Sequence, residues 1–141
     1  METQQSAKQI MSFDIGLLNI GIAVGNTLLK IAHPLTIITE PIKFQLFIKI
    51  DIIIKKWLPK LFIIGNGSNT KDETPLQLRI KKFSNKLYND YNLPIIFINE
   101  DFSSIEASAM LNQQQIYGIH QKDKTDDLAA CVILQRYFDS L

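Results

Sequence analysis

Residues 10–24, IMSFDIGLLNIGIAV, contain two short apolar runs separated by a turn-like segment. The runs at residues 10–13 and 20–24 are typical of β-strands, and the segment from Gly16 to Asn19 fits a hairpin turn. Asp14 stands at the end of the first run. A carboxylate crowded against an apolar strand end costs free energy unless a partner offsets its charge. This stretch therefore predicts a β-hairpin that carries a candidate functional acid.

Two further acids occupy similar positions. Glu100 follows the apolar run at residues 95–98, and Asp126 opens the last helical pattern, residues 128–138. Acids that gather in one place repel one another, and a divalent cation between them is the simplest remedy. Oxygen ligands suit Mg²⁺ or Mn²⁺, and such ions can activate a water molecule for phosphodiester hydrolysis. Taken singly, each acid also fits a turn residue, a solvated strand end or a helix-dipole charge.

The remaining pattern predicts an α/β fold. A third strand is expected at residues 30–38, where Pro34 favours an edge position or a bulge. Further strands are expected at residues 61–64 and 95–98, helices at 42–57, 75–91, 103–114 and 125–138, and a polar loop at 115–124. The order β-β-β-α-β-α-β-α-α predicts a mixed five-stranded sheet with helices on both faces. If the strands that end near Asp14, Gly65 and Glu100 are parallel neighbours, those residues converge at one sheet edge.

Composition limits the class of protein. The 141 residues are 46% hydrophobic and 21% charged, which predicts one globular domain at residues 10–141 behind a flexible tail at 1–9. A polar start and the lack of a long apolar run predict a cytoplasmic protein with no membrane contact. The single cysteine, Cys131, falls in a helical apolar stripe, so we expect it to be a buried apolar residue, and a disulfide within the chain is impossible. The net charge of +1 requires nucleic-acid contacts to rest on local patches.

Two such patches are available. The loop that contains Gly65, Asn66, Gly67, Ser68 and Lys71 could present backbone amides to a phosphate, although an ordinary flexible connection is an equal alternative. A second group of cations, Lys81, Lys82 and Lys86, could line a nucleic-acid backbone, although a solvated helix face is favoured. We expect His120 to be solvent-exposed rather than catalytic.

Four blocks of sequence resemble the YqgF family of Holliday junction resolvase-like proteins and pre-16S rRNA nucleases. They are Phe13-Asp14-Ile15-Gly16 with Asn19-Ile20-Gly21-Ile22-Ala23-Val24, then Ala32-His33-Pro34-Leu35, then Asn99-Glu100 with Ser103-Ser104 and Glu106-Ala107, and finally Asp126-Asp127-Leu128-Ala129-Ala130 with Val132-Ile133-Leu134-Gln135. The resemblance implies a ribonuclease H-like fold and catalytic roles for Asp14, Glu100 and Asp126. It also implies nucleic-acid contacts at Ser103 and Ser104.

Two of the three departures from that family concern cations. Leu18-Asn19 stand where the family usually has basic residues, Asp101 stands where it usually has arginine, and Asn66-Gly67 replace Leu-Pro. Each missing cation removes a phosphate contact. Asp101 and Asp127 repel a phosphate unless they help to hold metal, and we expect Asp127 to be a further metal ligand.

The leading expectation is a metal-dependent nuclease, monomeric or homodimeric, that acts on structured RNA or branched DNA. Its role would be maturation of pre-16S rRNA in ribosome biogenesis, or Holliday junction resolution. The alternative is a weakened or inactive relative that binds nucleic acid or protein. A third interpretation, an actin-like ATPase, rests on Asp14-Ile15-Gly16 followed by Gly21. That class needs two such domains, and this chain has room for one.

Overall fold

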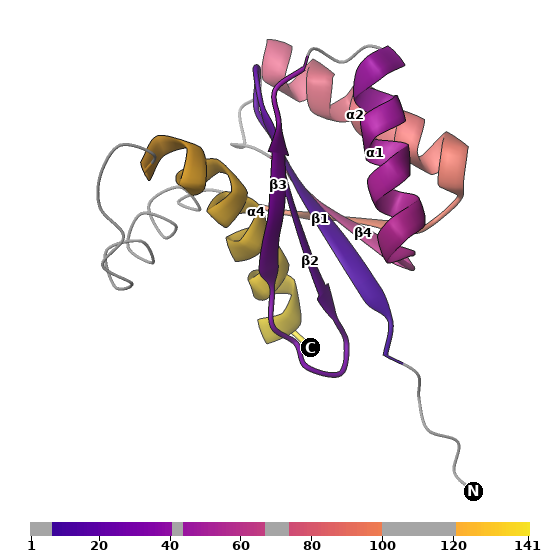
Figure 1. Cartoon of the computed structure of the whole chain (residues 1–141), viewed down its shortest axis with the longest axis vertical. Helices are drawn as coiled ribbons and strands as arrows, with labels where there is room; N and C mark the ends of the chain where they lie inside the picture. The colour runs from indigo at the N-terminus through magenta and orange to yellow at the C-terminus, as the bar shows by residue number, and fades with distance from the viewer. Residues whose placement is uncertain (1–6, 41–43, 67–73, 100–120) are drawn as a thin grey trace, which may run out of the picture.

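The computed structural model describes residues 7–40, 44–66, 74–99 and 121–141, with only the backbone described at 121–127. Its strands are β1 (Gln9–Ile15), β2 (Ile20–Asn26), β3 (His33–Ile38), β4 (Leu61–Gly65) and β5 (Ile95–Ile98). Its helices are α1 (Phe44–Trp57), α2 (Pro75–Tyr91) and α4 (Gln121–Asp139) (Figure 1). The helix predicted at residues 103–114 lies outside the described residues. None of the described helices has the length and hydropathy that a bilayer span requires.

The strands form one mixed sheet in the order β3-β2-β1-β4-β5. β1 pairs antiparallel with β2, and β2 pairs antiparallel with β3. β1, β4 and β5 are parallel neighbours. The predicted mixed five-stranded sheet is therefore confirmed.

Pro34 has the position that its chemistry predicts. It lies in β3 at the edge of the sheet, and the β2–β3 register shifts beside it, from Ile22–Thr36 to Ala23–Pro34. A proline cannot donate a backbone hydrogen bond to a neighbouring strand, and an edge strand or a bulge tolerates that loss.

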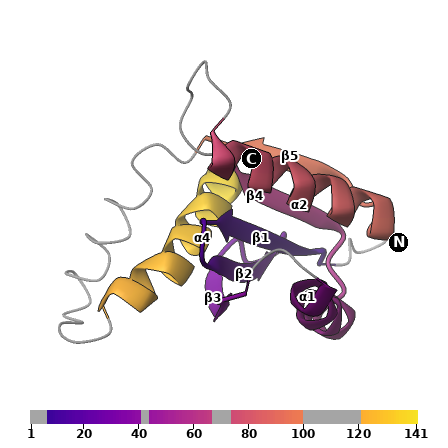
Figure 2. The same cartoon turned by 90° about the horizontal axis from the view of Figure 1, so that it is seen from above.

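Helices cover both faces of the sheet. Figure 2 shows α4 on one side, with α1 and α2 on the other. The α1–α2 side holds the larger core cluster, which includes Phe13, Phe62 and Phe83. The α4 side holds the smaller cluster, in which Ala23, Ala130 and Cys131 lie among larger aliphatic side chains and the Phe138 ring. Cys131 is buried, as the sequence predicts.

Local chemistry explains where α2 begins and ends. Thr74 is its N-cap, and Thr74 and Gln77 form a reciprocal capping box with Pro75 at the first turn. Such a box pairs backbone N–H groups that the helix itself leaves without partners. Asn92 ends the helix in the left-handed region, with φ of 55°. The predicted boundaries of this helix are confirmed.

The start of α4 corrects one prediction. The loop predicted at residues 115–124 is wrong at its end, because α4 already includes Gln121 to Lys124. Glutamine and lysine have high helix propensity. Because they are polar, this segment has no apolar residues at helical spacing, so hydrophobic periodicity does not indicate a helix there. Farther along, residues 129–134 are all buried, which a single apolar stripe does not predict.

Candidate active site

Asp14 lies near the end of β1, at the edge of the sheet where β1, β4 and β5 all terminate. The parallel register pairs Phe13 with Ile64, and Gly65 with Ile98. Asp14 follows Phe13 and Gly65 follows Ile64, so Asp14, Gly65 and Ile98 stand at one level of three adjacent strands. This is the sheet edge at which open α/β proteins bind ligands. The condition stated from the sequence, that these strands be parallel neighbours, is met by β1, β4 and β5.

The neighbouring residue Ser12 shows which face of the sheet Asp14 uses. Ser12 is fully buried, and its hydroxyl donates a 2.8 Å hydrogen bond to the carbonyl oxygen of Ala130 in α4. Side chains alternate along a strand, so residues two apart lie on the same face. Asp14, which is half-buried, therefore lies on the α4 face of the sheet, about 7 Å beyond Ser12 along the strand.

The direction of α4 relates its first turns to this edge. At the far end of the helix, a Cβ on Gly25 would stand 2.7 Å from Cε2 of Phe138. Gly25 pairs with Ile10, near the start of β1. α4 therefore runs opposite to β1, from the Asp14 end toward the Ile10 end. The backbone of Asp126 lies one turn before Ala130, about 6 Å nearer the Asp14 end along the helix axis.

The end of β5 is also tied to α4. Nη1 of Arg136 donates a 2.7 Å hydrogen bond to the carbonyl oxygen of Asn99, the residue directly before Glu100. Beside it, the Asn66 amide donates a 2.9 Å hydrogen bond to the carbonyl oxygen of Ile98. The expected anion loop thus begins, at Gly65 and Asn66, on the edge that carries Asp14.

Several expected site residues lie outside what the structure describes. They are Glu100, Gly67, Ser68, Lys71, Ser103 and Ser104, together with the side chains of Asp126 and Asp127. His120, which we expect to be solvent-exposed, also lies outside the described residues. Among the side chains that are described, no three His, Cys, Asp or Glu gather as metal ligands would. Asp14 is thus the one expected metal ligand whose side chain is described, and its hard carboxylate oxygens suit Mg²⁺ or Mn²⁺.

A separate groove lies between α1 and α2. It encloses about 680 Å³ and is lined by the residues Phe44, Phe47, Ile48, Asp51, Ile52, Lys86, Asp90 and Tyr91. Charges along it are paired, Lys55 with Asp51 at 2.8 Å and Lys86 with Asp90 at 2.9 Å. The hydrogen bond from Lys55, and then that from Tyr91, lower the pKa of Asp51. Because Lys86 is paired and also lies over the Phe47 ring, it fits the helix-face interpretation better than a phosphate-binding stripe.

Three features at the Asp14 end of the sheet could not be predicted, or were not predicted, from the sequence. Ser12 links β1 to α4, Arg136 links α4 to the end of β5, and two exposed leucines form the tip of the β1–β2 loop. A serine inside an apolar strand is a detectable signal, because a buried hydroxyl needs a hydrogen-bond partner. The contact of Arg136 has no signal in the sequence.

Comparisons with known proteins agree with this architecture. The RuvX family model, described as Holliday junction resolvase, matches residues 8–140. A protein of Methylobacillus flagellatus named "Putative pre-16S rRNA nuclease" is 40% identical over 133 residues, which cover 94% of this chain and 91% of the relative. A Haemophilus ducreyi protein of the same name is 36% identical over 135 residues, covering 95% of this chain and 98% of the relative.

Solved structures share the fold at low sequence identity. Thermus thermophilus RuvC in complex with a Holliday junction substrate gives a TM-score of 0.59 at 10% identity, covering 94% of each chain. The fowlpox virus Holliday junction resolvase gives 0.56 at 20% identity, covering 94% of this chain and 98% of that one. These matches confirm the expected ribonuclease H-like fold. Together with the family model and the relatives, they establish that this chain belongs to the RuvX family of Holliday junction resolvases.

Proposed function

We propose that this protein is a metal-dependent nuclease that hydrolyses phosphodiester bonds in structured nucleic acid. Asp14, Glu100 and Asp126 are its catalytic carboxylates, Asp127 is a further metal ligand, and the metal is Mg²⁺ or Mn²⁺. The observation that carries the proposal is the position of Asp14. It stands at the shared end of β1, β4 and β5, on the sheet face covered by α4.

The expected acids come from elements that end or begin near this edge. β5 lies two strand positions from β1, about 10 Å at the usual spacing, and Glu100 follows it by two residues in the sequence. The backbone of Asp126 lies one helical turn toward the Asp14 end from the Ser12–Ala130 contact. Residues from three elements can therefore supply ligands to one site.

The chain's own residues set the geometry. Bound divalent cations supply an activated water and charge stabilisation at the leaving oxygen. Asp14 is held on a rigid strand, because β1 is paired on both sides, with β2 and with β4. Ser12 holds α4 against that strand, which limits movement of the helix relative to Asp14. Such fixed positions lower the cost of aligning substrate and metal ligands.

The substrate we propose is a precursor of 16S ribosomal RNA, with branched DNA as the second candidate. The first follows from the names of the relatives, and the second from the family description and the fold shared with RuvC. Gly65, Asn66, Gly67, Ser68 and Lys71 would contact the phosphate backbone, with help from Ser103 and Ser104.

The decisive experiment is Asp14→Asn, assayed on labelled ribosomal RNA precursor and on a four-way DNA junction. Each substrate is incubated with Mg²⁺, with Mn²⁺ and with a chelator. We expect Asp14→Asn to reduce cleavage by at least about 100-fold, because a carboxylate that binds the metal directly matters more than the supporting groups whose loss costs about 10–100-fold. The thermal midpoint should stay the same or rise, since a half-buried charge is removed.

Asp90→Asn is the matched control. Asp90 also carries a carboxylate, but it is exposed on α2 and pairs with Lys86 at the groove described above. This variant should cleave like the wild type. Cleavage that survives in Asp14→Asn, or in the presence of chelator, would rule out the assigned site.

The missing family cations favour one alternative, a catalytically weakened relative that acts as a binding module for nucleic acid or protein. Leu18 and Asn19 stand where the family usually has a basic residue or pair, four and five residues after Asp14. Under this alternative, titration with Mn²⁺ shows no binding while the protein still captures its partner. If the wild-type protein binds Mn²⁺ and Asp14→Asn abolishes that binding, the result favours the nuclease over the binding module.

A further inference from the structure

The β1–β2 loop presents two leucines to solvent at the candidate active site. The loop spans residues 16–19, between the paired residues Ile15 and Ile20. Leu17 is 58% exposed and Leu18 is 76% exposed. We call these two residues the leucine tip. A single exposed leucine needs no explanation, but two together on one loop form a local apolar surface.

The leucine tip stands on a constrained support. The Gly16 amide donates a 2.7 Å hydrogen bond to the Asn19 carbonyl oxygen, which closes the turn. The Thr39 hydroxyl donates a 2.8 Å hydrogen bond to Oδ1 of Asn19, which ties the loop to the end of β3. Ile15 and Ile20, at the base of the loop, are fully buried. The leucines are therefore held outward by a turn that cannot easily fold them onto the core.

The leucine tip also lies beside the proposed reaction centre. Leu17 is three residues beyond Asp14 in the chain, and the loop continues past the last β1–β2 pair at the same sheet edge. Nucleic acid bound with a phosphodiester at Asp14 would pass this loop.

The chemistry of leucine limits what it can contact there. A leucine gains nothing from a phosphate, and a continuous duplex shows mainly phosphates and groove edges on its outside. A base that has left the stack exposes an apolar face, and aliphatic side chains are known to insert at such steps. Burial of leucine surface against that face is favourable.

We propose that the leucine tip is a contact site for the face of an unstacked base next to Asp14. It would make the protein select nucleic acid interrupted by unpaired or branched nucleotides over continuous duplex. This inference deepens the proposed nuclease function and rests on it for the position of the substrate.

The test measures binding rather than cleavage. The Asp14→Asn background keeps the substrates intact, and each probe is a short RNA or DNA duplex, either fully paired or with a bulge that carries 2-aminopurine. The readouts are the ratio of the two dissociation constants and the fluorescence of 2-aminopurine, which reports contact with the bulged base. Leu17→Ser with Leu18→Ser should reduce the preference for the bulged probe about tenfold.

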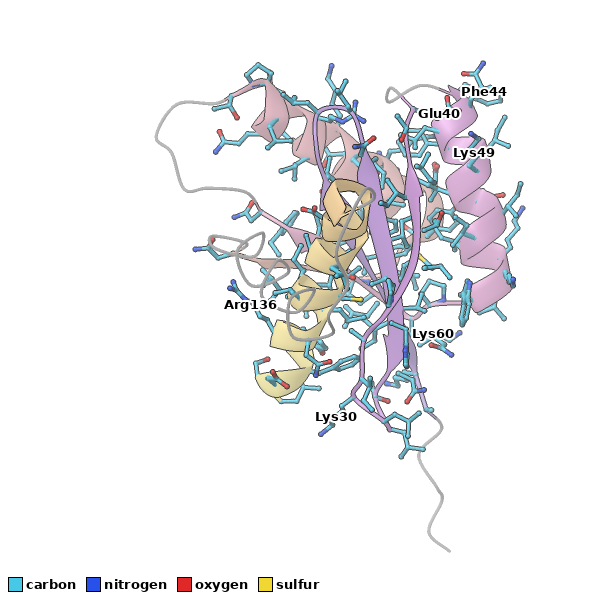
Figure 3. All side chains as sticks on the ribbon, turned by 60° about the vertical axis from the view of Figure 1, so that its left-hand side comes forward. Lys30, Glu40, Phe44, Lys49, Lys60 and Arg136 are labelled. Atoms are coloured by element: carbon cyan, nitrogen blue, oxygen red, sulfur yellow. The ribbon has the colours of Figure 1, made fainter. Side chains whose placement is uncertain are left out.

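The chain offers a matched control at the opposite end of the sheet. Leu28 and Leu29, in the β2–β3 loop, are 71% and 63% exposed, and both amides bond to Oδ1 of Asn26. Figure 3 shows the separation, because Lys30 marks this loop and Glu40 lies at the end that carries the leucine tip. Leu28→Ser with Leu29→Ser should leave the ratio unchanged.

A second variant separates base contact from general affinity. Leu18→Lys should tighten binding to both probes, through phosphate attraction, while the preference for the bulge falls. An unchanged ratio in the leucine-tip variants, or an equal loss in the control pair, would overturn the proposal. If the wild-type protein cleaves neither RNA nor DNA, that result counts against the proposed nuclease function. The ratio of dissociation constants would still test the leucine tip by itself.

Discussion

The two faces of the sheet are packed with different kinds of side chain. On the α1–α2 face, the Phe13 ring lies 5.7 Å from that of Phe62 and 5.1 Å from that of Phe83, measured between centroids. On the α4 face, Ala23, Ala130 and the Ser12 hydroxyl are buried next to the strands, and the Phe138 ring packs near the end of the helix. The first face buries large aromatic surface, and the second allows a helix to lie close to the strands.

This difference separates stability from site geometry. Large buried rings dominate the free energy of a core, so the α1–α2 face should carry most of the stability. Small residues leave little slack between helix and sheet, so the α4 face should decide where the first turns of α4 stand relative to Asp14. Changes on the first face should therefore cost the most stability, and changes at the Ser12–Ala130 contact on the second should disturb catalysis more than folding.

The largest expected effect is on the aromatic face. Phe83→Ala removes a fully buried ring that contacts both Phe13 and Phe47. We expect a loss of about 3–5 kcal/mol in the free energy of unfolding, measured by urea denaturation. The fraction that remains folded should cleave normally. Phe97→Ala, at a half-exposed ring, is the control and should cost far less.

An intermediate effect is expected at Gly25, where the Phe138 ring of α4 lies against the backbone of β2. A Cβ on Gly25 would stand 2.6 Å from the carbonyl oxygen of Ile31 and 2.7 Å from the Phe138 ring. Gly25→Ala should cost about 1–3 kcal/mol, because backbone as well as side chain must shift. Adding Phe138→Leu should recover only part of the loss. Full recovery would mean that the ring, and not the Ile31 backbone, sets the limit.

The smallest loss of stability is expected at the Ser12–Ala130 hydrogen bond, which gives the most direct test of how the site is positioned. Ser12→Ala removes the hydrogen bond to Ala130 and should cost about 1 kcal/mol. Cleavage should fall about tenfold, because a supporting group near proposed ligands is lost.

Ser84→Ala is its matched control. Ser84 is also buried, but its hydroxyl donates to the carbonyl oxygen of Ile80 within its own helix, on the other face. The two variants should lose similar stability, and only Ser12→Ala should lose activity. Equal activities would show that the strand-to-helix hydrogen bond does not position the site.

Much of the fold could be predicted from local patterns. Pro34 predicted an edge or a bulge because proline lacks an N–H, and both are present. Pro75 and Asn92 marked the ends of α2 because backbone groups at helix ends need partners. The pattern failed at Gln121 to Lys124, where helix propensity acts without an apolar period.

The candidate site, like the fold, has features that follow from local sequence and others that depend on distant contacts. Sequence alone determined that Asp14 stands at a strand end and that residues 10–24 form a hairpin, because alternation and turn chemistry act between near neighbours. Only the tertiary structure decided that β4 lies between β1 and β5, and that α4 runs back toward the Asp14 end. Strand order and helix direction depend on contacts between residues far apart in the sequence, such as Ser12 with Ala130. The spacing of apolar residues within one segment contains no information about such contacts.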